Sequence, residues 1–348
     1  MVERCFGRRW AEAQRPIEII SVETARSCNL ACVQCGHHAK QIHERLDSQS
    51  LTTGLMTLTT FANILPILDW SAHLNLDLHG EPLLNEQIEE MIRLAKAAAP
   101  HLNVTLTSNF TRMNPQRAES LLNSGLTGIQ VSIAGAARET HERIMIGSGF
   151  ERLLANLRAF AEARRRLPNV LKSFSACVTL MRSNVEELVH LPPLLSRFGI
   201  DVIRVNNVLP YYPEMLSESL FEGPGWPRRW QQARAETVAQ ARRHKVQIYF
   251  ASREDQILAC RMPLRSFSVT YDGEVCPCFM LDTRGGSDFF FRGETHRLPY
   301  IRFGNVNCGN IRQIWNSEEF RIYRKRFETG QHPSYCKPCP VGRGLICG

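Results

Sequence analysis

The first 250 residues alternate between two hydrophobic periods, and this alternation constrains the fold more than any other feature. Six short segments typical of β-strands are separated by longer segments with helical spacing of apolar residues. The strand-like segments are 17–23, 74–79, 103–108, 128–134, 174–180 and 202–208. Strands that alternate with helices predict parallel βαβ units with right-handed crossovers. Because the sixth unit ends near residue 210, we expect a partial (β/α)6 barrel of the TIM type within an α/β fold.

The helix-like segments and the change of composition near residue 253 predict two domains. The helix-like segments are those after Asn85 and at 152–166, 184–198 (broken by Pro192 and Pro193) and 229–244. Residues 209–229 are rich in breakers and aromatics and predict a long loop above the barrel. Beyond residue 253 the alternation stops and Cys, Gly and Phe become frequent. We therefore expect a barrel at 1–252 and a small Cys-rich domain at 253–348.

The twelve cysteines are unexpected for the compartment that the rest of the sequence indicates. No apolar run approaches the roughly 20 residues that span a bilayer, and the charged N-terminal segment MVERCFGRRW has no apolar core for a secretory signal. The net charge is +8, but the arginines are spread along the chain, so we expect neither a nucleic-acid partner nor a membrane. In the cytoplasm, which we expect here, cysteines favour metal ligation or redox chemistry over disulfides.

Three cysteines form a first group directly after the first predicted strand. Cys28, Cys32 and Cys35, in SCNLACVQC, have three and two residues between them and can converge on one metal centre. They leave one coordination position without a protein ligand, as catalytic metal sites do. A zinc site would take His37 or His38 as its fourth ligand, and buried structural cysteines are the other alternative. The position at the end of a barrel strand favours a catalytic cluster.

Four cysteines of the C-terminal region form a second group. Cys260 and Cys278 are separated by 17 residues, and Cys336 and Cys339 form a CxxC motif. Two such pairs can close a four-thiolate site, for which the spacing alone leaves zinc and iron–sulfur open. Five cysteines remain outside both groups: Cys5, Cys177, Cys276, Cys308 and Cys347.

The first group and the motifs that follow it resemble those of the radical S-adenosylmethionine (SAM) enzymes. The resemblance implies that Cys28, Cys32 and Cys35 hold a [4Fe–4S] cluster whose open iron binds the amino and carboxylate groups of SAM. It also implies a set of SAM contacts at the ends of successive strands: Gly80, Glu81 and Pro82 (a GEP motif), Ser108, Asn109, Ser132, Arg182, Asn206 and Val208. Gln34 departs from the family, which usually has an aromatic residue there near the adenine.

The second group looks like the auxiliary-cluster region of these enzymes, the SPASM or shorter twitch domain. The segment RFGNVNCGNIRQIWNSEEFRIYRKRF resembles the connecting segment of that domain. The resemblance implies that Cys260, Cys278, Cys336 and Cys339 hold a second [4Fe–4S] cluster. Cys347, eight residues after Cys339, is either a remnant ligand or a free thiol. It covers residues 15–348, nearly the whole chain.

The resemblance implies that an electron from a donor such as flavodoxin or ferredoxin cleaves SAM, and that the resulting 5′-deoxyadenosyl radical abstracts hydrogen from a C–H bond. Two outcomes follow. Oxidation by two electrons would resemble the cyclitol dehydrogenases of antibiotic biosynthesis. Epimerisation would need a thiol as hydrogen donor, for which we predict Cys308 first and Cys276 second.

The predicted barrel starts by residue 17, which leaves no room for the peptide-recognition domain of many relatives. We therefore expect a small carbohydrate-like substrate, a sugar or a cyclitol-containing natural product, met at the barrel mouth by polar or aromatic side chains: Asp77, His79, Tyr211, Tyr212 and Glu214. One alternative is a radical SAM maturase of a ribosomal peptide. A remote alternative is a zinc-stabilised nucleic-acid-binding protein.

Overall fold

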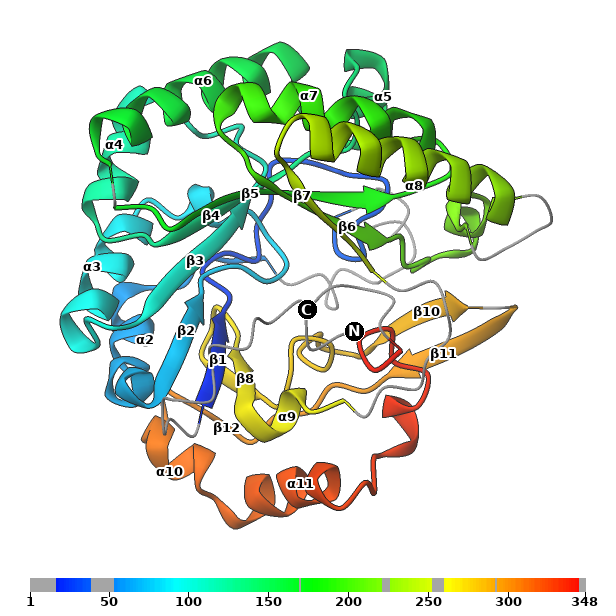
Figure 1. Cartoon of the computed structure of the whole chain (residues 1–348). Helices are drawn as coiled ribbons and strands as arrows, with labels where there is room; N and C mark the ends of the chain where they lie inside the picture. The colour runs from blue at the N-terminus through cyan, green and yellow to red at the C-terminus, as the bar shows by residue number, and fades with distance from the viewer. Residues whose placement is uncertain are drawn as a thin grey trace.

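The computed structural model describes residues 17–38, 53–168, 170–220, 226–251, 260–291 and 293–343. Figure 1 shows a strongly curved sheet with a row of helices outside it and the C-terminal segments at one end. Two of the unassigned cysteines, Cys5 and Cys347, lie outside the described residues. No described helix is long and apolar enough to cross a bilayer.

Seven strands of the N-terminal region pair in chain order, and all these pairs are parallel. They are β1 (Ile17–Val22), β2 (Ser71–Asn75), β3 (Asn103–Ser108), β4 (Gly128–Ser132), β5 (Ser173–Leu180), β6 (Val202–Asn207) and β7 (Gln247–Phe250). The six predicted strands and the α/β barrel class are confirmed. β2 begins three residues earlier than predicted, and β7 adds a strand beyond the expected six.

The two faces of this sheet have opposite polarity. In β3, Val104 and Leu106 are fully buried, whereas Thr105 and Thr107 between them are half-buried. β6 repeats the pattern, with a buried Ile203 and Val205 beside a half-buried Arg204 and Asn206. Because side chains alternate across a strand, one face packs under the helices and the other lines the concave interior of the barrel. The interior of this barrel is therefore polar, unlike the branched apolar filling of most complete barrels.

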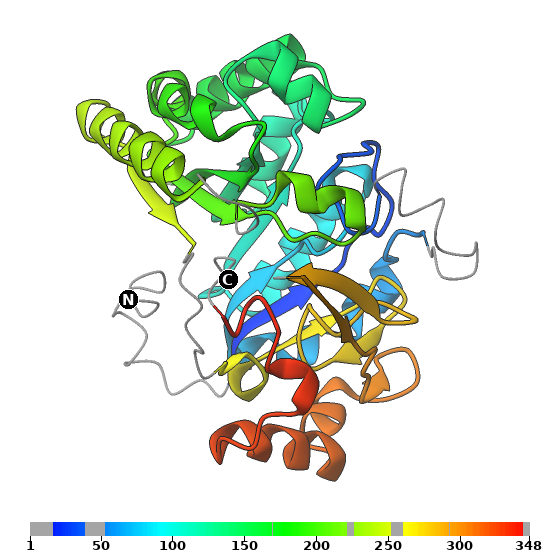
Figure 2. The same ribbon diagram turned by 90° about the vertical axis from the view of Figure 1, so that its right-hand side faces the viewer.

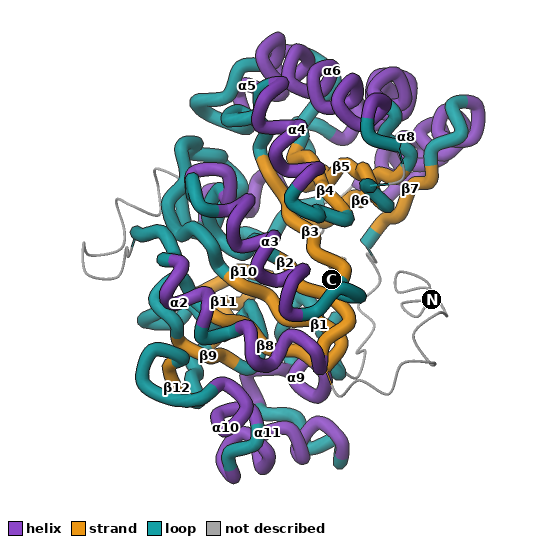
Figure 3. Tube along the Cα trace, turned by 90° about the vertical axis from the view of Figure 1, so that its left-hand side faces the viewer, coloured by secondary structure: helices purple, strands orange, loops and turns teal. Residues whose placement is uncertain are grey.

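Helices cover the outer face of the barrel sheet (Figure 3). The longer ones are α3 (Ile88–Ala98), α4 (Pro115–Asn123), α6 (Phe150–Arg166) and α8 (Trp226–Arg243), with α2 (Leu58–Ala62), η3 (Leu65–Trp70), η4 (Pro82–Leu84) and α5 (Arg138–Ile144) between them. Asn85 does not cap α3, because the helix begins after Gln87. The expected break at Pro192 and Pro193 is present: that segment is divided into η5 (Val185–His190), α7 (Leu191–Leu195) and η6 (Ser196–Phe198).

The C-terminal region extends the barrel sheet at its other edge. β8 (Ser266–Val269) pairs in parallel with β1, and β9 (Glu274–Cys276) and β12 (Gly304–Asn305) follow in antiparallel order. The hairpin of β10 (Ser287–Phe291) and β11 (Glu294–Leu298) stands apart from this sheet (Figure 2). The other helical elements of the C-terminal region are α9 (Met262–Arg265), α10 (Ile311–Trp315), α11 (Glu318–Glu328) and η8 (Ser334–Cys336). The division at residue 253 stays a prediction.

Candidate active site

The first cysteine group lies in the loop that leaves the C-terminal end of β1. The backbone N–H of Cys35 donates to the carbonyl of Cys32 at 3.0 Å, which closes a turn. The N–H of Val33 donates at 2.9 Å to the carbonyl of Ile144, the last residue of α5. The hydroxyl of Tyr212, in the predicted loop after β6, donates to the carbonyl of Val33. The loop is therefore held from both sides of the barrel mouth.

The thiols of this loop interact electrostatically with one another. Burial raises the pKa of Cys28 to about 11, and burial together with the charges of Cys35 and Cys28 raises the pKa of Cys32 further. The backbone N–H groups of His37 and His38 donate to Sγ of Cys35 at 3.4 and 3.2 Å. Buried thiolates are stable only beside strong positive charge, and iron supplies such charge. The three thiols therefore fit an iron–sulfur cluster.

Glu81 of the GEP motif lies in the turn between β2 and η4 and is 2% exposed. Its carboxylate accepts hydrogen bonds from Oγ of Ser108 at 2.7 Å, from the N–H of Asn109 at 2.7 Å and from the N–H of Leu83 at 3.1 Å. Burial raises the pKa of Glu81 to about 7, and these hydrogen bonds oppose the shift. A buried carboxylate beside the cysteine loop is suited to receive the ammonium group of an amino acid.

The GEP motif and the cysteine loop form one packed unit. A Cβ on Gly80 would lie 2.3 Å from the carbonyl oxygen of Ala25 and 2.4 Å from that of Ser27, so only glycine fits. The N–H of Glu81 donates to the same Ser27 carbonyl at 2.9 Å. Pro82 then begins η4. The structure therefore holds this motif against the residue that precedes Cys28, and the contacts of Gly80, Glu81 and Pro82 with SAM stay a prediction.

Asn29 is a site residue that the sequence analysis missed. Its Oδ1 accepts from Nδ2 of Asn109 at 3.1 Å, and its Nδ2 donates to Oγ1 of Thr111 at 2.8 Å. These bonds connect the cysteine loop to the Ser-Asn pair after β3. Its position directly after Cys28 was the one signal in the sequence, because a polar side chain beside a cluster cysteine can hydrogen-bond to a neighbouring loop.

Gln34 and Val208 are the two residues predicted to lie near the adenine. Val208 is buried in an apolar cluster with Leu30, against which Cys28 and Cys32 pack. Oε1 of Gln34 is buried and has no hydrogen-bond partner among the described residues. A buried polar atom without a partner indicates a group that binds there. The two positions therefore fit an apolar ring with polar edges.

The remaining predicted SAM contacts are spread over β4 to β6. Ser132 ends β4 and is half-buried. Nε of Arg182 donates to the carbonyl of Ser219 at 2.9 Å, which directs this side chain toward the loop before α8. Nδ2 of Asn206 donates to Sγ of Cys177 at 3.5 Å inside the barrel. The contacts of these three residues with SAM stay a prediction.

The second cysteine group surrounds one apolar cavity. Cys260, Cys278, Cys336 and Cys339 line it together with Met262, Pro263, Phe279, Met280, Leu281, Leu298, Phe327 and Val341. Burial raises the pKa of Cys260 to about 11 and that of Cys336 to about 12. No three His, Cys, Asp or Glu side chains of the described chain are arranged to hold a single metal ion. Four thiols around one cavity are the ligand set of a four-thiolate iron–sulfur cluster.

The three other described cysteines differ in their surroundings. Cys308, the first predicted hydrogen donor, is exposed in the turn between β12 and α10. Cys276, the second, is fully buried in β9, where burial and the charge of Asp282 raise its pKa. Cys177 of β5 lies in the barrel interior beside Asn206. Of the three, only Cys177 lies among the polar side chains of the barrel interior, and the donor role stays a prediction for the other two.

Side chains from both regions meet between the two cysteine groups. Nε2 of His79, just after β2, lies 2.6 Å from Oδ1 of Asp282 in the C-terminal region. The ring of His79 lies against that of His37, with centroids 3.9 Å apart. The ring of Tyr211 packs against Gly36, where an added Cβ would be 2.8 Å away. The charges of Cys35, Cys339 and Asp282 all act on Tyr211, and with its burial they raise its pKa.

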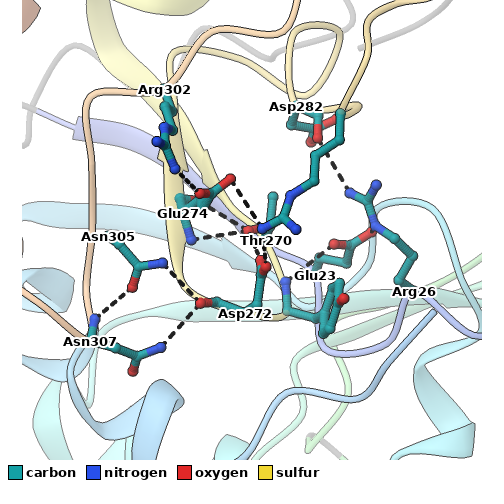
Figure 4. A network of polar contacts seen from close by, with 11 residues as sticks. Glu23, Arg26, Thr270, Asp272, Glu274, Asp282, Arg302, Asn305 and Asn307 are labelled. Atoms are coloured by element: carbon teal, nitrogen blue, oxygen red, sulfur yellow. Dashed lines mark hydrogen bonds and ion pairs between the residues drawn. The ribbon is translucent and has the colours of Figure 1, made fainter. Parts of the chain in front are cut away.

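A buried ion pair, Glu23 with Arg26, lies next to the contact between His79 and Asp282. Nε of Arg26 donates to Oε1 of Glu23 at 2.8 Å, and its NH2 group donates to the backbone carbonyl of Asp282 at 3.4 Å (Figure 4). The other Glu23 oxygen accepts from the N–H of Tyr271 at 3.2 Å. Because Glu23 and Arg26 lie five and two residues before Cys28, these bonds hold the first cysteine loop and the Asp282 loop in fixed positions relative to each other.

Comparison with known families covers both parts of the site. Residues 22–191 match the Radical SAM superfamily, and residues 260–340 match the SPASM iron–sulfur cluster-binding domain. The AdoMet-dependent heme synthase of Nitratidesulfovibrio vulgaris is 23% identical over 355 residues, which cover 98% of this chain and 89% of that protein. The PqqA peptide cyclase of Rhizobium meliloti is 25% identical over 330 residues, which cover 91% of this chain and 78% of that protein.

Solved structures give the same fold. Streptococcus suis SuiB bound to its precursor peptide SuiA has a TM-score of 0.64 at 14% identity, over 95% of this chain and 71% of that chain. SuiB has also been solved with S-adenosylmethionine. The cofactors are therefore SAM and [4Fe–4S] clusters, as expected from the cysteine groups. The chain belongs to the radical SAM superfamily and carries a C-terminal SPASM domain.

Proposed function

We propose that this chain abstracts a hydrogen atom from a C–H bond of a peptide and completes the oxidation of that position by two electrons. The observation that carries the proposal is the meeting of two cysteine groups on one buried region. Tyr211 is close enough to interact with both Cys35 and Cys339. A cluster at the second group would lie beside the substrate and could receive an electron from it.

Within this proposal the chain's own residues bind, orient and exclude water. The clusters and SAM supply the radical and the electron acceptor when bound. Glu81 receives the SAM ammonium group, Val208 packs against the adenine, and Tyr212 holds the Cys32 loop in place. The buried surroundings of both groups keep water from the reacting atoms.

The peptide substrate is supported by relatives rather than by a contact in this chain. Full-length similarity extends to a PqqA peptide cyclase, and mycofactocin maturases of mycobacteria are 26% identical over about half of the chain. A structure of the same fold holds its precursor peptide. These names favour the peptide alternative over the carbohydrate-like substrate expected from the sequence, which is not confirmed.

A small polar molecule is the second candidate, and the polar barrel interior favours it. Side chains from neighbouring strands bond to one another there: Thr105 to Asn75 at 2.5 Å, and Gln130 to Ser175 at 3.3 Å. Asp77 is half-buried close by, and burial raises its pKa. Such a surface could bind hydroxyl groups, and Cys177 would then be the thiol that donates a hydrogen atom to the substrate. Epimerisation belongs to this second candidate.

One experiment separates the candidates. The enzyme is reconstituted anaerobically and should hold about eight irons per chain, as two four-iron clusters require. It is then incubated with SAM, reductant and either peptides encoded beside its gene or glycosylated metabolites from the same neighbourhood. A peptide that has lost two hydrogens supports the proposal. An unchanged peptide and an epimerised metabolite with solvent deuterium contradict it, and two tightly bound zinc ions without iron would exclude both candidates.

A further inference from the structure

The contact between His79 and Asp282 joins the two family regions at their shared buried surface. His79 lies directly before Gly80 of the GEP motif, and Asp282 follows the cluster cysteine Cys278 by four residues. The side chain of Asp282 is fully buried, and that of His79 is 11% exposed. Nε2 and Oδ1 are 2.6 Å apart, the length of a strong charge-assisted hydrogen bond.

Asp282 is incompletely satisfied, which is unusual for a buried carboxylate. Its Oδ2 is buried and has no hydrogen-bond partner among the described residues. The guanidinium of Arg26 is paired with Glu23 and donates to the backbone carbonyl of Asp282 rather than to this carboxylate. A buried carboxylate with one open oxygen is costly unless a cation or a ligand group completes it. Positive charge that develops on His79 would do so.

The arrangement makes His79 a proton acceptor. When Asp282 accepts from Nε2–H, the lone pair of the neutral imidazole lies on Nδ1, where it can take a proton. Asp282 then stabilises the imidazolium that forms, as the carboxylate of a hydrolase triad does. The neighbouring His37 is less suited, because burial holds its pKa well below the usual range.

We propose that His79 is the base that accepts the substrate's proton during oxidation, and that Asp282 is its positioning residue. This inference rests on the proposed function. Hydrogen-atom transfer from a carbon to the 5′-deoxyadenosyl radical leaves a carbon radical next to an N–H or O–H group. That group would lose its proton to Nδ1 of His79, and with the second cluster in place the remaining electron would have an acceptor as the C=N or C=O bond forms. One hydrogen atom, one proton and one electron account for the two-electron oxidation.

Other charged groups surround the pair. Arg26 and Glu23 lie on the β1 side, His37 lies against the ring of His79, and Tyr211 faces Asp282 from the loop after β6. Cys276 and Cys278 face Asp282 from its own region. The charge of Arg26 is paired with that of Glu23. Asp282 contacts His79 directly, through Oδ1 and Nε2.

The test uses the reconstituted full chain and a peptide deuterated at the reacting carbon. We expect His79→Gln and Asp282→Asn to lower product formation by about 100-fold, the usual contribution of a general base. Deuterium should still appear in 5′-deoxyadenosine, and an organic radical should accumulate in the electron paramagnetic resonance spectrum. Asp282→Glu should restore part of the rate, since it keeps a carboxylate.

The matched control is His296→Gln. His296 lies 3.7 Å from Glu294 in the β10–β11 hairpin, so these two side chains form a second His–carboxylate pair among the described residues. This variant should keep wild-type kinetics, and all variants should retain wild-type iron content and substrate-free SAM cleavage. Hydrogen exchange at the imidazole carbon of His79, followed by mass spectrometry on the holoenzyme, should change in Asp282→Asn and not in His296→Gln.

Two results would overturn the assignment. Wild-type product rates in both His79→Gln and Asp282→Asn would exclude a base at this position. A parallel loss of deuterium transfer and product would mean that the pair binds SAM or substrate and does not accept a proton. Failure of the wild type to oxidise any peptide would instead refute the proposed function.

Discussion

Glu81 illustrates how one residue can link burial, pH and cofactor affinity. Burial raises its pKa to about 7, so the free protein carries the carboxylate charge mainly above that pH. SAM binding should therefore strengthen as pH rises through about 7, because only the charged form attracts the ammonium group. Glu81→Gln should weaken SAM binding by about 10-fold or more and remove this pH dependence.

The measurement is the dissociation constant of SAM at pH 6 and pH 8 by equilibrium dialysis on reconstituted protein. Glu90→Gln is the matched control, since Glu90 is exposed on α3 and pairs with Arg93. The control should bind like the wild type. A pH-independent wild-type constant, or an unchanged constant in Glu81→Gln, would show that Glu81 does not receive the ammonium group.

The unassigned thiols give a second prediction at the residue scale. Oxidation needs no hydrogen donor, so Cys177→Ala, Cys276→Ala and Cys308→Ala should each keep product formation within about threefold of the wild type, once folding is confirmed by iron content. In deuterated water the product should carry no deuterium on the reacting carbon, as mass spectrometry can show. Loss of turnover in Cys177→Ala together with deuterium in the wild-type product would favour epimerisation inside the barrel.

At the scale of single elements, the loop between β1 and the first cysteine depends on the turn after β2. Gly80 lies under the carbonyls of Ala25 and Ser27, so Gly80→Ala must push this loop away from η4. We expect the variant to lose the first cluster and keep the second. Iron should fall from about eight to about four atoms per chain.

Gly309→Ala is the matched control for Gly80→Ala. An added Cβ at residue 309 would meet its nearest atom at 3.8 Å, an ordinary contact. Iron and sulfide analysis after anaerobic reconstitution should give wild-type values for this variant. Full iron content in Gly80→Ala would show that the close approach of Gly80 does not determine the position of the cysteine loop.

The accuracy of the sequence-based predictions followed how local the determining interactions are. Period-two segments such as β3 were located to the residue, because alternation of Val104 and Leu106 with polar neighbours needs no distant partner. The start of β2 was predicted too late, because Ser71 and Ala72 join the strand by pairing with β1. The cysteine groups and Glu81 were found from spacing and motif. The contact of His79 with Asp282 spans 203 residues of sequence and was visible only in the fold.

At the scale of the whole molecule, the two family regions share one sheet. β8 pairs with β1 over four residues, and the N–H of Glu23 donates to the carbonyl of Val269 at 2.8 Å. The buried pair of Glu23 and Arg26 also depends on Tyr271 and Asp282. A chain that ends at residue 252 would therefore leave the edge of β1 unpaired and a charged pair exposed.

We expect fragment 1–252 to aggregate or to unfold without a cooperative transition, and the full chain to unfold in one transition by calorimetry. Co-expression of fragments 1–252 and 253–348 should restore the single transition, because the missing contacts are non-covalent. This control separates loss of partner strands from damage caused by cutting the chain. If fragment 1–252 alone melted cooperatively at the temperature of the full chain, the boundary at residue 253 would divide two independently folding domains. The pairing of β8 with β1 would then contribute little to the stability of the barrel.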